Sequence, residues 1–404
     1  MDSLLIRNAR LIDSTRDFNG DLLIVNGKIG SLGKDISGSA PEGCSIIDGE
    51  GLALMPSFTD LHCHFRDPGF TYKEDILSGS KAAVRGGYTS INLMPNTRPV
   101  CSSMGVVDYV LTKAKEYGLV DVHQSVSITK DFSGESIAHL ESLKPYVKFI
   151  SEDGFGVDSD AVMLKAMMKA KELGLGVMSH CENRALSKED MRLAEDVETI
   201  RNVGLARYTG CRLHVCHVST EYSLKEILRS KKDGAKVTCE VTPHHIALTE
   251  GTKYRVNPPL RKKSDVEAII EGIREGWIDA IATDHAPHTY EDKEGGAPGM
   301  VGLETAFSVC YTELVKKGHI SLGRLVQLMS ERPSAILGIE KGTLIIGRNA
   351  DLVLVDLDKE ITIDSRCFAS KGKNTPFDGR KYFGEIITTI KGGKVVYMKE
   401  DCRL

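Results

Sequence analysis

The sequence predicts an α/β protein, a (β/α)8 TIM barrel with a small β-sandwich domain formed by the N- and C-terminal segments. Three observations predict this fold. Short alternating strands occupy both ends of the chain, strand and helix patterns alternate through the middle, and polar residues follow the middle strands where they end. A chain of 404 residues is long enough for one large barrel and a smaller appended domain.

Both ends of the chain have the pattern of short strands that is typical of a β domain. Strands are predicted at 3–13 and 20–30, the second with an Asn26-Gly27 hairpin signal, and again at 342–347, 350–356 and 386–397. We therefore expect residues 1–50 together with 342–404 to form the small β domain, and residues 51–341 to form the barrel.

The middle of the chain repeats an apolar strand followed by a helix. The eight predicted strands are 51–61, 89–94, 121–127, 146–150, 176–180, 212–217, 236–242 and 279–284. The predicted helices between them are 75–85, 105–117, 136–143, 160–173, 196–208, 222–231 and 265–275, and helices at 305–317 and 322–337 complete the unit. In such a barrel the functional groups lie at the carboxyl ends of the strands.

The amino-acid composition argues against a nucleic-acid or membrane partner. A net charge of -4, with 41% hydrophobic and 27% charged residues, is ordinary for a globular protein and predicts no nucleic-acid partner. No apolar run approaches the roughly 18 to 20 residues of a membrane span, and the N-terminus lacks the regions of a signal peptide. The ten cysteines are scattered without a Cys-x-x-Cys pair, which is typical of reduced thiols. We expect a cytoplasmic protein with a small-molecule substrate and no membrane contact.

The strongest local signal is His62-Cys-His64 at the end of the first barrel strand. Side chains two residues apart on a strand face the same way, so both imidazoles could hold a divalent metal at about 2.0–2.1 Å. The alternative is a pair of histidines on a surface edge. Other strand ends carry further candidate groups, namely Asn96, Lys148, Asp153, His180, His217, Asp284 and His288. His244 and His245 also follow a strand, but we assign them structural support and no ligand role. Their joint position favours two metal ions about 3.5–4 Å apart that share a hydroxide. Imidazole and carboxylate ligands favour zinc, and manganese or cobalt would also fit.

Several motifs carry a family resemblance. They are His62-Cys-His-Phe-Arg-Asp-Pro-Gly69, Met94-Pro-Asn96, His214-Val-Cys-His217, Val241-Thr-Pro-His-His245 and Asp284-His-Ala-Pro-His288. The chain resembles the amidohydrolase superfamily and, more narrowly, the class I dihydroorotases, over nearly its whole length. The resemblance implies reversible cyclisation of N-carbamoyl-L-aspartate to dihydroorotate and water, the third step of pyrimidine synthesis.

The resemblance also implies roles for individual residues. His62 and His64 would hold one metal with Asp284, and His180 and His217 the other, giving two zinc ions per subunit. Asp284 would also be the catalytic residue, moving a proton between the metal-bridging hydroxide and the leaving nitrogen.

The substrate carries a carboxylate, and the resemblance implies a clamp for it. Arg66 offers a planar fork suited to a carboxylate, with Asn96 and His288 beside it and His64 nearby. Asn257, Pro298 and Gly299 match the family's contacts to the ring. The alternatives are a salt bridge from Arg66 to Asp67 or Asp75, and a turn role for Asn257 before Pro258.

Two residues compete to bridge the metals. Some class I enzymes use a lysine carboxylated by CO2 on strand four, and others use an aspartate in a following Asp-Asp-Gly. This chain has both candidates, Lys148 within the predicted strand and Asp153 beyond it. We favour Lys148, as an anionic carbamate, because it lies in the strand.

Other readings remain open at this point. The polar, glycine-rich loop 289–299 could close over substrate. A related cyclic amidase of the allantoinase or hydantoinase type is one alternative function, and a non-catalytic scaffold is another. A homodimer, and association with aspartate transcarbamoylase as in some class I relatives, are both compatible with the resemblance.

Overall fold

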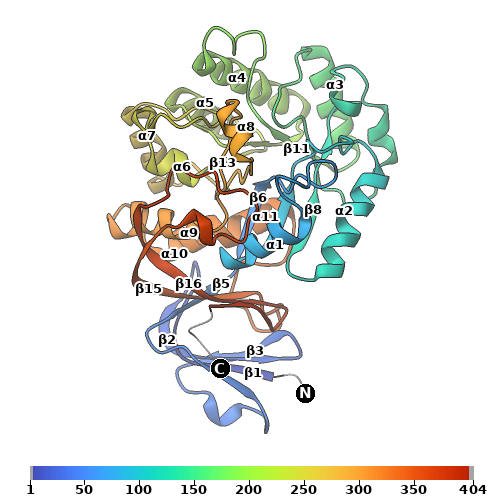
Figure 1. Cartoon of the computed structure of the whole chain (residues 1–404). Helices are drawn as coiled ribbons and strands as arrows, with labels where there is room; N and C mark the ends of the chain where they lie inside the picture. Colours follow the sequence, from blue (N-terminus) through green and yellow to red (C-terminus); the bar gives the residue numbers. More distant parts are fainter. Residues whose placement is uncertain (1–2, 400–404) are drawn as a thin grey trace.

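The computed structural model describes residues 3–399 and contains one large mixed sheet beside a set of parallel strands covered by helices (Figure 1). The large sheet has eight strands, in the order β17-β16-β15-β5-β1-β2-β3, with β4 pairing with β1. Their bounds are β1 (Ser3–Ile12), β2 (Asp17–Val25), β3 (Lys28–Gly33), β4 (Ser45–Asp48), β5 (Ala53–Pro56), β15 (Leu352–Thr362), β16 (Lys381–Lys391) and β17 (Lys394–Met398). The antiparallel pair β5–β15 joins strands from the two ends of the chain.

The expected small β domain corresponds to this sheet, which takes strands from both ends of the chain. Because β5 pairs with β1 on one edge and β15 on the other, the N- and C-terminal strands are hydrogen-bonded into one sheet. Irregularities in register, for example between Asp356 and Glu360, interrupt the regular ladder. The Asn26-Gly27 signal lies at the β2–β3 hairpin, where both residues have positive φ.

The parallel strands follow one another in chain order. They are β6 (Phe58–Cys63), β7 (Tyr88–Leu93), β8 (Asp121–Gln124), β9 (Val126–Ser127), β10 (Phe149–Ser151), β11 (Gly176–Ser179), β12 (Arg212–Val215), β13 (Val237–Val241) and β14 (Ala280–Ile281). One sheet contains β6, β7 and β8, and the other contains β9 to β14. Only Ser125 separates β8 from β9, and a parallel bridge joins Cys63 of β6 to His285 beyond β14.

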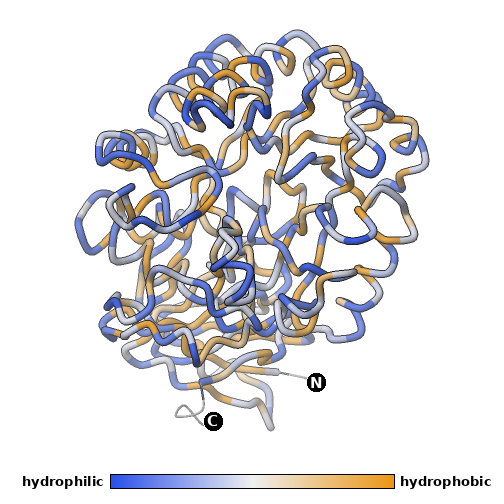
Figure 2. Tube along the Cα trace, turned by 45° about the horizontal axis from the view of Figure 1, so that its top comes forward, coloured by the Kyte–Doolittle hydropathy of each residue, from blue (hydrophilic) through white to orange (hydrophobic). Residues whose placement is uncertain are grey.

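Helices alternate with these strands and lie on their outer side (Figure 1). They are α1 (Ile76–Arg85), α2 (Met104–Tyr117), α3 (Asp160–Glu172), α4 (Met191–Thr209), α5 (Glu221–Lys232), α6 (Pro243–Ala247), α7 (Lys263–Arg274), α8 (Tyr290–Glu294), α9 (Ala306–Cys310), α10 (Leu322–Val326) and α11 (Arg332–Leu337). Segments of π-helix at Tyr311–Lys316 and Gln327–Glu331 extend α9 and join α10 to α11. Short 3-10 turns occur at Ser37–Ser39, Lys130–Phe132, Ala138–Ser142, Glu250–Thr252 and Ser365–Cys367. Hydrophobic and hydrophilic residues alternate along the outer helices, as expected where one face of a helix is buried (Figure 2).

Three predicted elements are wrong in detail. The strand expected at 51–61 is two strands in different sheets, because β5 ends at Pro56, which lacks an N–H, and pairs with β15. The helix expected at 136–143 is a short 3-10 segment, and the following strand begins only at Phe149. The loop expected at 289–299 contains α8, whose N-terminus is capped by Thr289.

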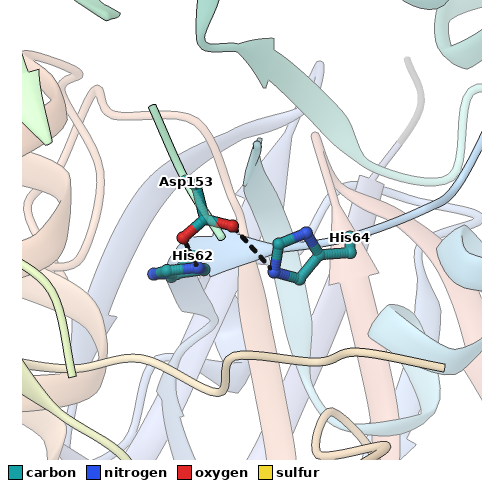
Figure 3. Close-up of side chains that lie close together, drawn as sticks. All are labelled: His62, His64 and Asp153. Atoms are coloured by element: carbon teal, nitrogen blue, oxygen red, sulfur yellow. Dashed lines mark ion pairs between the residues drawn. The ribbon is translucent and has the colours of Figure 1, made fainter. Parts of the chain in front are cut away.

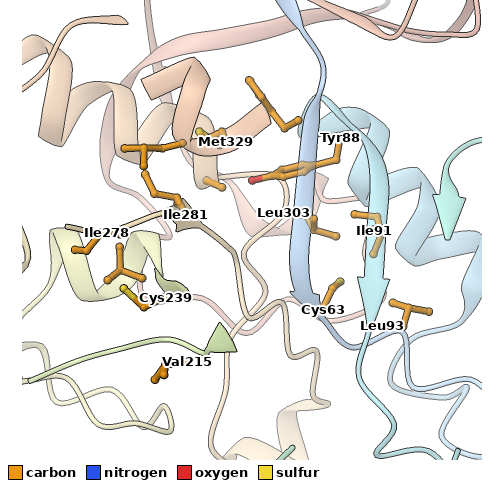
Figure 4. Packing of buried hydrophobic residues seen from close by; sticks show 14 of the residues in the cluster. Cys63, Tyr88, Ile91, Leu93, Val215, Cys239, Ile278, Ile281, Leu303 and Met329 are labelled. Atoms are coloured by element: carbon orange, nitrogen blue, oxygen red, sulfur yellow. The ribbon is translucent and has the colours of Figure 1, made fainter. Parts of the chain in front are cut away.

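The hydrophobic core of the described residues is divided among four clusters, one of which packs residues 248–260 and Met300 against residues 363–382. A small cluster fills the space between the parallel strands and includes Leu61, Phe149, Met178 and Ala280 from four different strands. A large cluster packs the outer helices against the strands and extends to the large sheet (Figure 4). A third cluster lies on the large sheet. The cysteines among residues 3–399 are unpaired and mostly buried. Within that range no helix is both long and apolar enough to cross a membrane.

Candidate metal centre

Asp153 lies between the two histidines of the first parallel strand (Figure 3). One carboxylate oxygen, Oδ1, is 3.1 Å from His62 Nε2, and the other, Oδ2, is 3.6 Å from His64 Nε2. A shift of register in β6 between Asp60 and Cys63 places one extra residue opposite β7, next to both histidines. All three side chains are buried, so this carboxylate is enclosed by imidazoles.

A second pair of histidines completes the group. His180 follows β11 and His217 follows β12, and His180 Nδ1 lies 2.9 Å from His217 Nε2 and 3.8 Å from Asp153 Oδ1. Asp284 approaches from the other side, with Oδ1 3.1 Å from His64 Nε2 and 3.6 Å from His62 Nε2. Asp153 therefore contacts both pairs, and the structure brings together all the predicted ligands except Lys148.

The donor set fits divalent metal. His62 Nε2 is buried and has no hydrogen-bond partner of suitable geometry among the described residues, which is costly unless the atom has another ligand. Two triads, His62–His64–Asp153 and Asp153–His180–His217, place one ligand atom from each member within 4.8 Å of the others. Burial alone would raise the pKa of Asp153, but the surrounding imidazoles hold it well below its usual range. These are the buried nitrogen and oxygen donors that bind zinc.

Lys148 lies apart from this group, contrary to our expectation. Its ammonium donates to the carbonyl of Pro145 at 3.1 Å. Lys148 precedes β10, at the opposite end of the strand from Asp153, and neighbouring strand side chains alternate. Because Phe149 points into the interior cluster, Lys148 faces outward, whereas Asp153 reaches the histidines.

Carboxylate and amide side chains form hydrogen bonds with the ring nitrogens of His62 and His64 that face away from the ligand group. Glu240 on β13 accepts from His62 Nδ1 at 3.2 Å and from His214 Nε2 at 2.9 Å. Burial raises the pKa of Glu240, but these two imidazoles outweigh burial and lower it to about 2. Asn96 accepts from His64 Nδ1 at 2.9 Å and donates to Asp153 at 3.2 Å. These hydrogen bonds leave the Nε2 atoms of His62 and His64 directed at the ligand group.

Glu182 is a site residue that sequence reasoning missed. Its Oε2 accepts from His180 Nε2 at 3.0 Å and from Asn257 Nδ2 at 2.7 Å. Burial raises the pKa of Glu182, but these hydrogen bonds prevail and bring it to about 2. The available signal was its position two residues after His180, in the loop that follows β11.

A cavity of about 190 Å³ opens in front of the histidines. All seven predicted substrate-binding residues line it, namely His64, Arg66, Asn96, Asn257, His288, Pro298 and Gly299. Asp153, His180, His217 and Asp284 line it as well. The ligand group and the predicted substrate contacts thus share one cavity.

Arg66 has neither of the structural partners that the sequence offered. Asp67 is bonded to Tyr109 and Lys113, while Asp75 caps α1 and pairs with Lys371. The Arg66 guanidinium instead lies 3.4 Å from the carbonyl of Pro287 and 3.3 Å from His288 Nε2. Among residues 3–399 it forms no ion pair, and Arg66 lines the cavity.

The backbone is strained at three of these positions. Arg66, His217 and Asp284 have φ values of 59°, 34° and 47°, in the left-handed region that non-glycine residues seldom adopt. Each follows directly after, or lies close to, the end of a parallel strand. Such strain is typical of functional sites, where the surrounding structure holds an unfavourable conformation.

A distant segment holds the cavity rim. Asn374, between β15 and β16, accepts from the backbone N–H of His288 at 3.0 Å. Its amide also donates to the carbonyls of Ala286 and Gly299, both at 3.2 Å. Sequence reasoning missed this contact, because nothing local links residue 374 to residues 286–299.

The fold and the metal centre define a class of protein, and comparison with known proteins agrees. The model of the amidohydrolase family matches residues 53–396, so the chain belongs to that family. Among solved structures, L-hydantoinase (dihydropyrimidinase) from Arthrobacter aurescens is similar, with a TM-score of 0.90 at 28% identity, covering 100% of this chain and 98% of that one.

Curated relatives narrow the class. The dihydroorotase of Clostridium botulinum (strain Eklund 17B / Type B) is 53% identical over 399 residues, covering 98% of this chain and 100% of the relative. The dihydroorotase of Aquifex aeolicus (strain VF5) is 42% identical over 425 residues, covering 98% and 100%. Within the amidohydrolase family, the chain belongs with the dihydroorotases.

Proposed function

We propose that this protein is a dihydroorotase, which interconverts N-carbamoyl-L-aspartate and dihydroorotate with loss or gain of water in pyrimidine biosynthesis. The observation that carries the proposal is the unpaired Arg66 guanidinium, which faces the same cavity as the ligand group. A partly buried cation without a counter-ion is costly, and a substrate carboxylate would remove that cost. Dihydroorotate has such a carboxylate beside a ring amide.

We propose His62, His64, Asp153, His180, His217 and Asp284 as the ligands of two divalent metal ions, with zinc as the expected metal. Asp153 takes the bridging role in this proposal, so no carbamate on Lys148 is required. Bound metal would polarise a carbonyl and lower the pKa of water towards about 7.

The chain's own residues orient the substrate and move a proton. Arg66 holds the carboxylate, with His288 beside it, and Asn257, Pro298 and Gly299 line the wall for the ring. In the ring-opening direction, water attacks the ring amide carbonyl and a carboxylate oxygen of Asp284 takes its proton. Asp284 then passes that proton to the ring nitrogen as the carbon–nitrogen bond breaks, and ring closure reverses these steps.

Further proposals concern the closure of the barrel, the domain bounds, the cellular location and the assembly of the protein. We propose that the parallel strands form one closed (β/α)8 barrel, supported by the single residue between β8 and β9 and by the Cys63–His285 bridge. The corresponding units are residues 51–341 for the barrel and residues 1–50 with 342–404 for the β domain. A cytoplasmic location is supported by the unpaired, buried cysteines. A homodimer and association with aspartate transcarbamoylase rest on the family resemblance alone.

A hydantoinase activity is the second candidate, because solved hydantoinases share the fold. The two candidate activities differ in whether the substrate supplies a carboxylate for Arg66. A hydantoin or dihydropyrimidine ring without a carboxylate would leave the guanidinium unpaired. We therefore expect such rings to be poor substrates.

The test is turnover of zinc-loaded protein on L-dihydroorotate, hydantoin and allantoin. We expect selective opening of dihydroorotate. Arg66→Ala should lose this activity by about 10²-fold or more, since charge-assisted contacts contribute about 1.5–3 kcal/mol and the cation also orients the ring. Arg98→Ala, which removes an exposed arginine outside the cavity lining, is the matched control. Opening of hydantoin in preference to dihydroorotate would overturn the proposal.

A further inference from the structure

Glu182 joins the metal centre to the substrate wall. One oxygen, Oε2, accepts from both His180 Nε2 and Asn257 Nδ2, at 3.0 Å and 2.7 Å. His180 belongs to the ligand group, and Asn257 lines the cavity. A single carboxylate atom therefore fixes one residue from each part of the site.

The contact with His180 fixes which ring nitrogen carries the proton. A neutral imidazole has one N–H and one lone pair, and the carboxylate of Glu182 requires the N–H at Nε2. The lone pair is then at Nδ1, the atom that lies 2.9 Å from His217 Nε2 and 3.8 Å from Asp153 Oδ1. This tautomer presents Nδ1 to metal.

The contact with Asn257 fixes the orientation of its amide. Because a carboxylate accepts and does not donate, the NH2 group of Asn257 must face Glu182. Asn257 Oδ1 then points elsewhere, and it is buried without a partner among residues 3–399. An unsatisfied acceptor of this kind at a cavity wall is costly unless a ligand supplies the donor.

We propose that Glu182 is a positioning residue that sets both the His180 tautomer and the Asn257 amide, so that the site selects a substrate with an N–H at the Asn257 wall. This inference rests on the proposed function and deepens it. The ring N–H groups of dihydroorotate supply such a donor, whereas a ring alkylated on nitrogen would leave Asn257 Oδ1 unpaired.

The competing explanation is that Glu182 only supports the local chain, and three variants separate the two. Glu182→Gln keeps the shape but brings an NH2 group to one side of the contact. Glu182→Asp keeps the charge with a shorter side chain. Glu189→Gln makes the same change of charge on the same loop, at an exposed residue that does not line the cavity, and is the matched control.

The first readout is zinc affinity, measured by competition between the metal-free protein and a chromogenic chelator. We expect Glu182→Gln to weaken zinc binding about 10- to 100-fold, as loss of a partner behind a ligating histidine does. Glu182→Asp should retain more of the affinity, and Glu189→Gln all of it. This readout needs no catalysis, so it tests the His180 contact even if wild-type protein fails to open dihydroorotate, a result that would overturn only the proposed function.

The second readout is KM for dihydroorotate at saturating zinc, in Glu182→Gln, Asn257→Ala and the double variant. We expect each single variant to raise KM, Asn257→Ala to keep wild-type zinc affinity, and the double variant to raise KM no further than Asn257→Ala alone. Unchanged zinc affinity in a folded Glu182→Gln protein, or fully additive effects on KM, would overturn the inference. If Glu182→Gln does not fold, Glu182→Asp takes its place. A Glu182→Asp protein with the zinc affinity and the KM of wild type would then overturn the inference.

Discussion

Replacing Asp153 with asparagine tests which residue joins the two halves of the metal centre. The change removes one negative charge and keeps the shape of the side chain. In the structure Asp153 contacts three imidazoles, at 3.1 Å from His62, 3.6 Å from His64 and 3.8 Å from His180. A variant without this charge should therefore lose affinity for both of the proposed metal ions together.

The size of the effect follows from the geometry. A carboxylate oxygen and a unit positive charge about 3.1 Å apart interact by roughly 5 kcal/mol at an effective dielectric constant of about 20. Desolvation offsets part of this energy, and a divalent ion adds to it. We expect Asp153→Asn to weaken metal binding by about three orders of magnitude, at about 1.4 kcal/mol for each tenfold change.

The assay is metal content of the purified protein by elemental analysis, followed by zinc titration of the metal-free form. Lys148→Ala is the matched control, since Lys148 lies outside the ligand group and its ammonium donates to the Pro145 carbonyl. We expect that control to keep its metal and to need no bicarbonate for activity. If Lys148→Ala loses metal while Asp153→Asn retains it, our reasoning about the bridge is refuted.

Two further predictions concern the cavity rim and the stability of the fold. Asn374→Ala should raise KM for dihydroorotate by about tenfold with zinc affinity unchanged, because three hydrogen bonds of roughly 1 kcal/mol each hold residues 286–299; unchanged steady-state kinetics would contradict this. Burial lowers the pKa of His123 to about 4, opposed by Asp121 and reinforced by Lys341 and Lys148. As pH falls, the His123 imidazole takes up a proton first in the unfolded chain, near pH 6.5. The stabilisation of the folded state by neutral His123 is therefore complete above that pH and is lost as pH falls towards 4. Urea unfolding of wild type and His123→Gln measures this effect. Between pH 6.5 and 4 the free energy of unfolding should fall by up to about 3 kcal/mol less in the variant than in wild type; equal pH dependence of the two proteins would refute this prediction.

Much of the site could be predicted because its residues follow strands of regular period. His62, His64, His180, His217 and Asp284 all come at strand ends, so the strand pattern placed them together before any contact was known. The same periodicity could have excluded Lys148. The strand was expected at 146–150, which put Lys148 within it, but the actual strand begins at Phe149. A boundary predicted at Phe149 would have left Lys148 outside the strand and removed the reason for preferring it to Asp153.

Contacts between distant elements could not be predicted in this way. Glu182 and Asn257 meet across 75 positions, and Asn374 reaches His288 across 86. Neither pair has a repeat or spacing that would reveal it, because side-chain contacts of this kind depend on how loops pack after the strands have formed.

The strained residues explain why the site resists local reasoning more than the rest of the fold. Rules of propensity place glycine or asparagine where φ is positive, as they do at Asn26-Gly27, yet Arg66, His217 and Asp284 adopt such angles. Their local preference favours another conformation, so the surrounding structure must supply the difference, of order 1–3 kcal/mol for each residue. The Cys63–His285 bridge, and the hydrogen bond from the His64 N–H to the His285 carbonyl, fix the chain just before Arg66 and just after Asp284. These contacts between neighbouring strand ends thus help to stabilise a backbone that the local sequence alone would not adopt, and both Arg66 and Asp284 line one cavity.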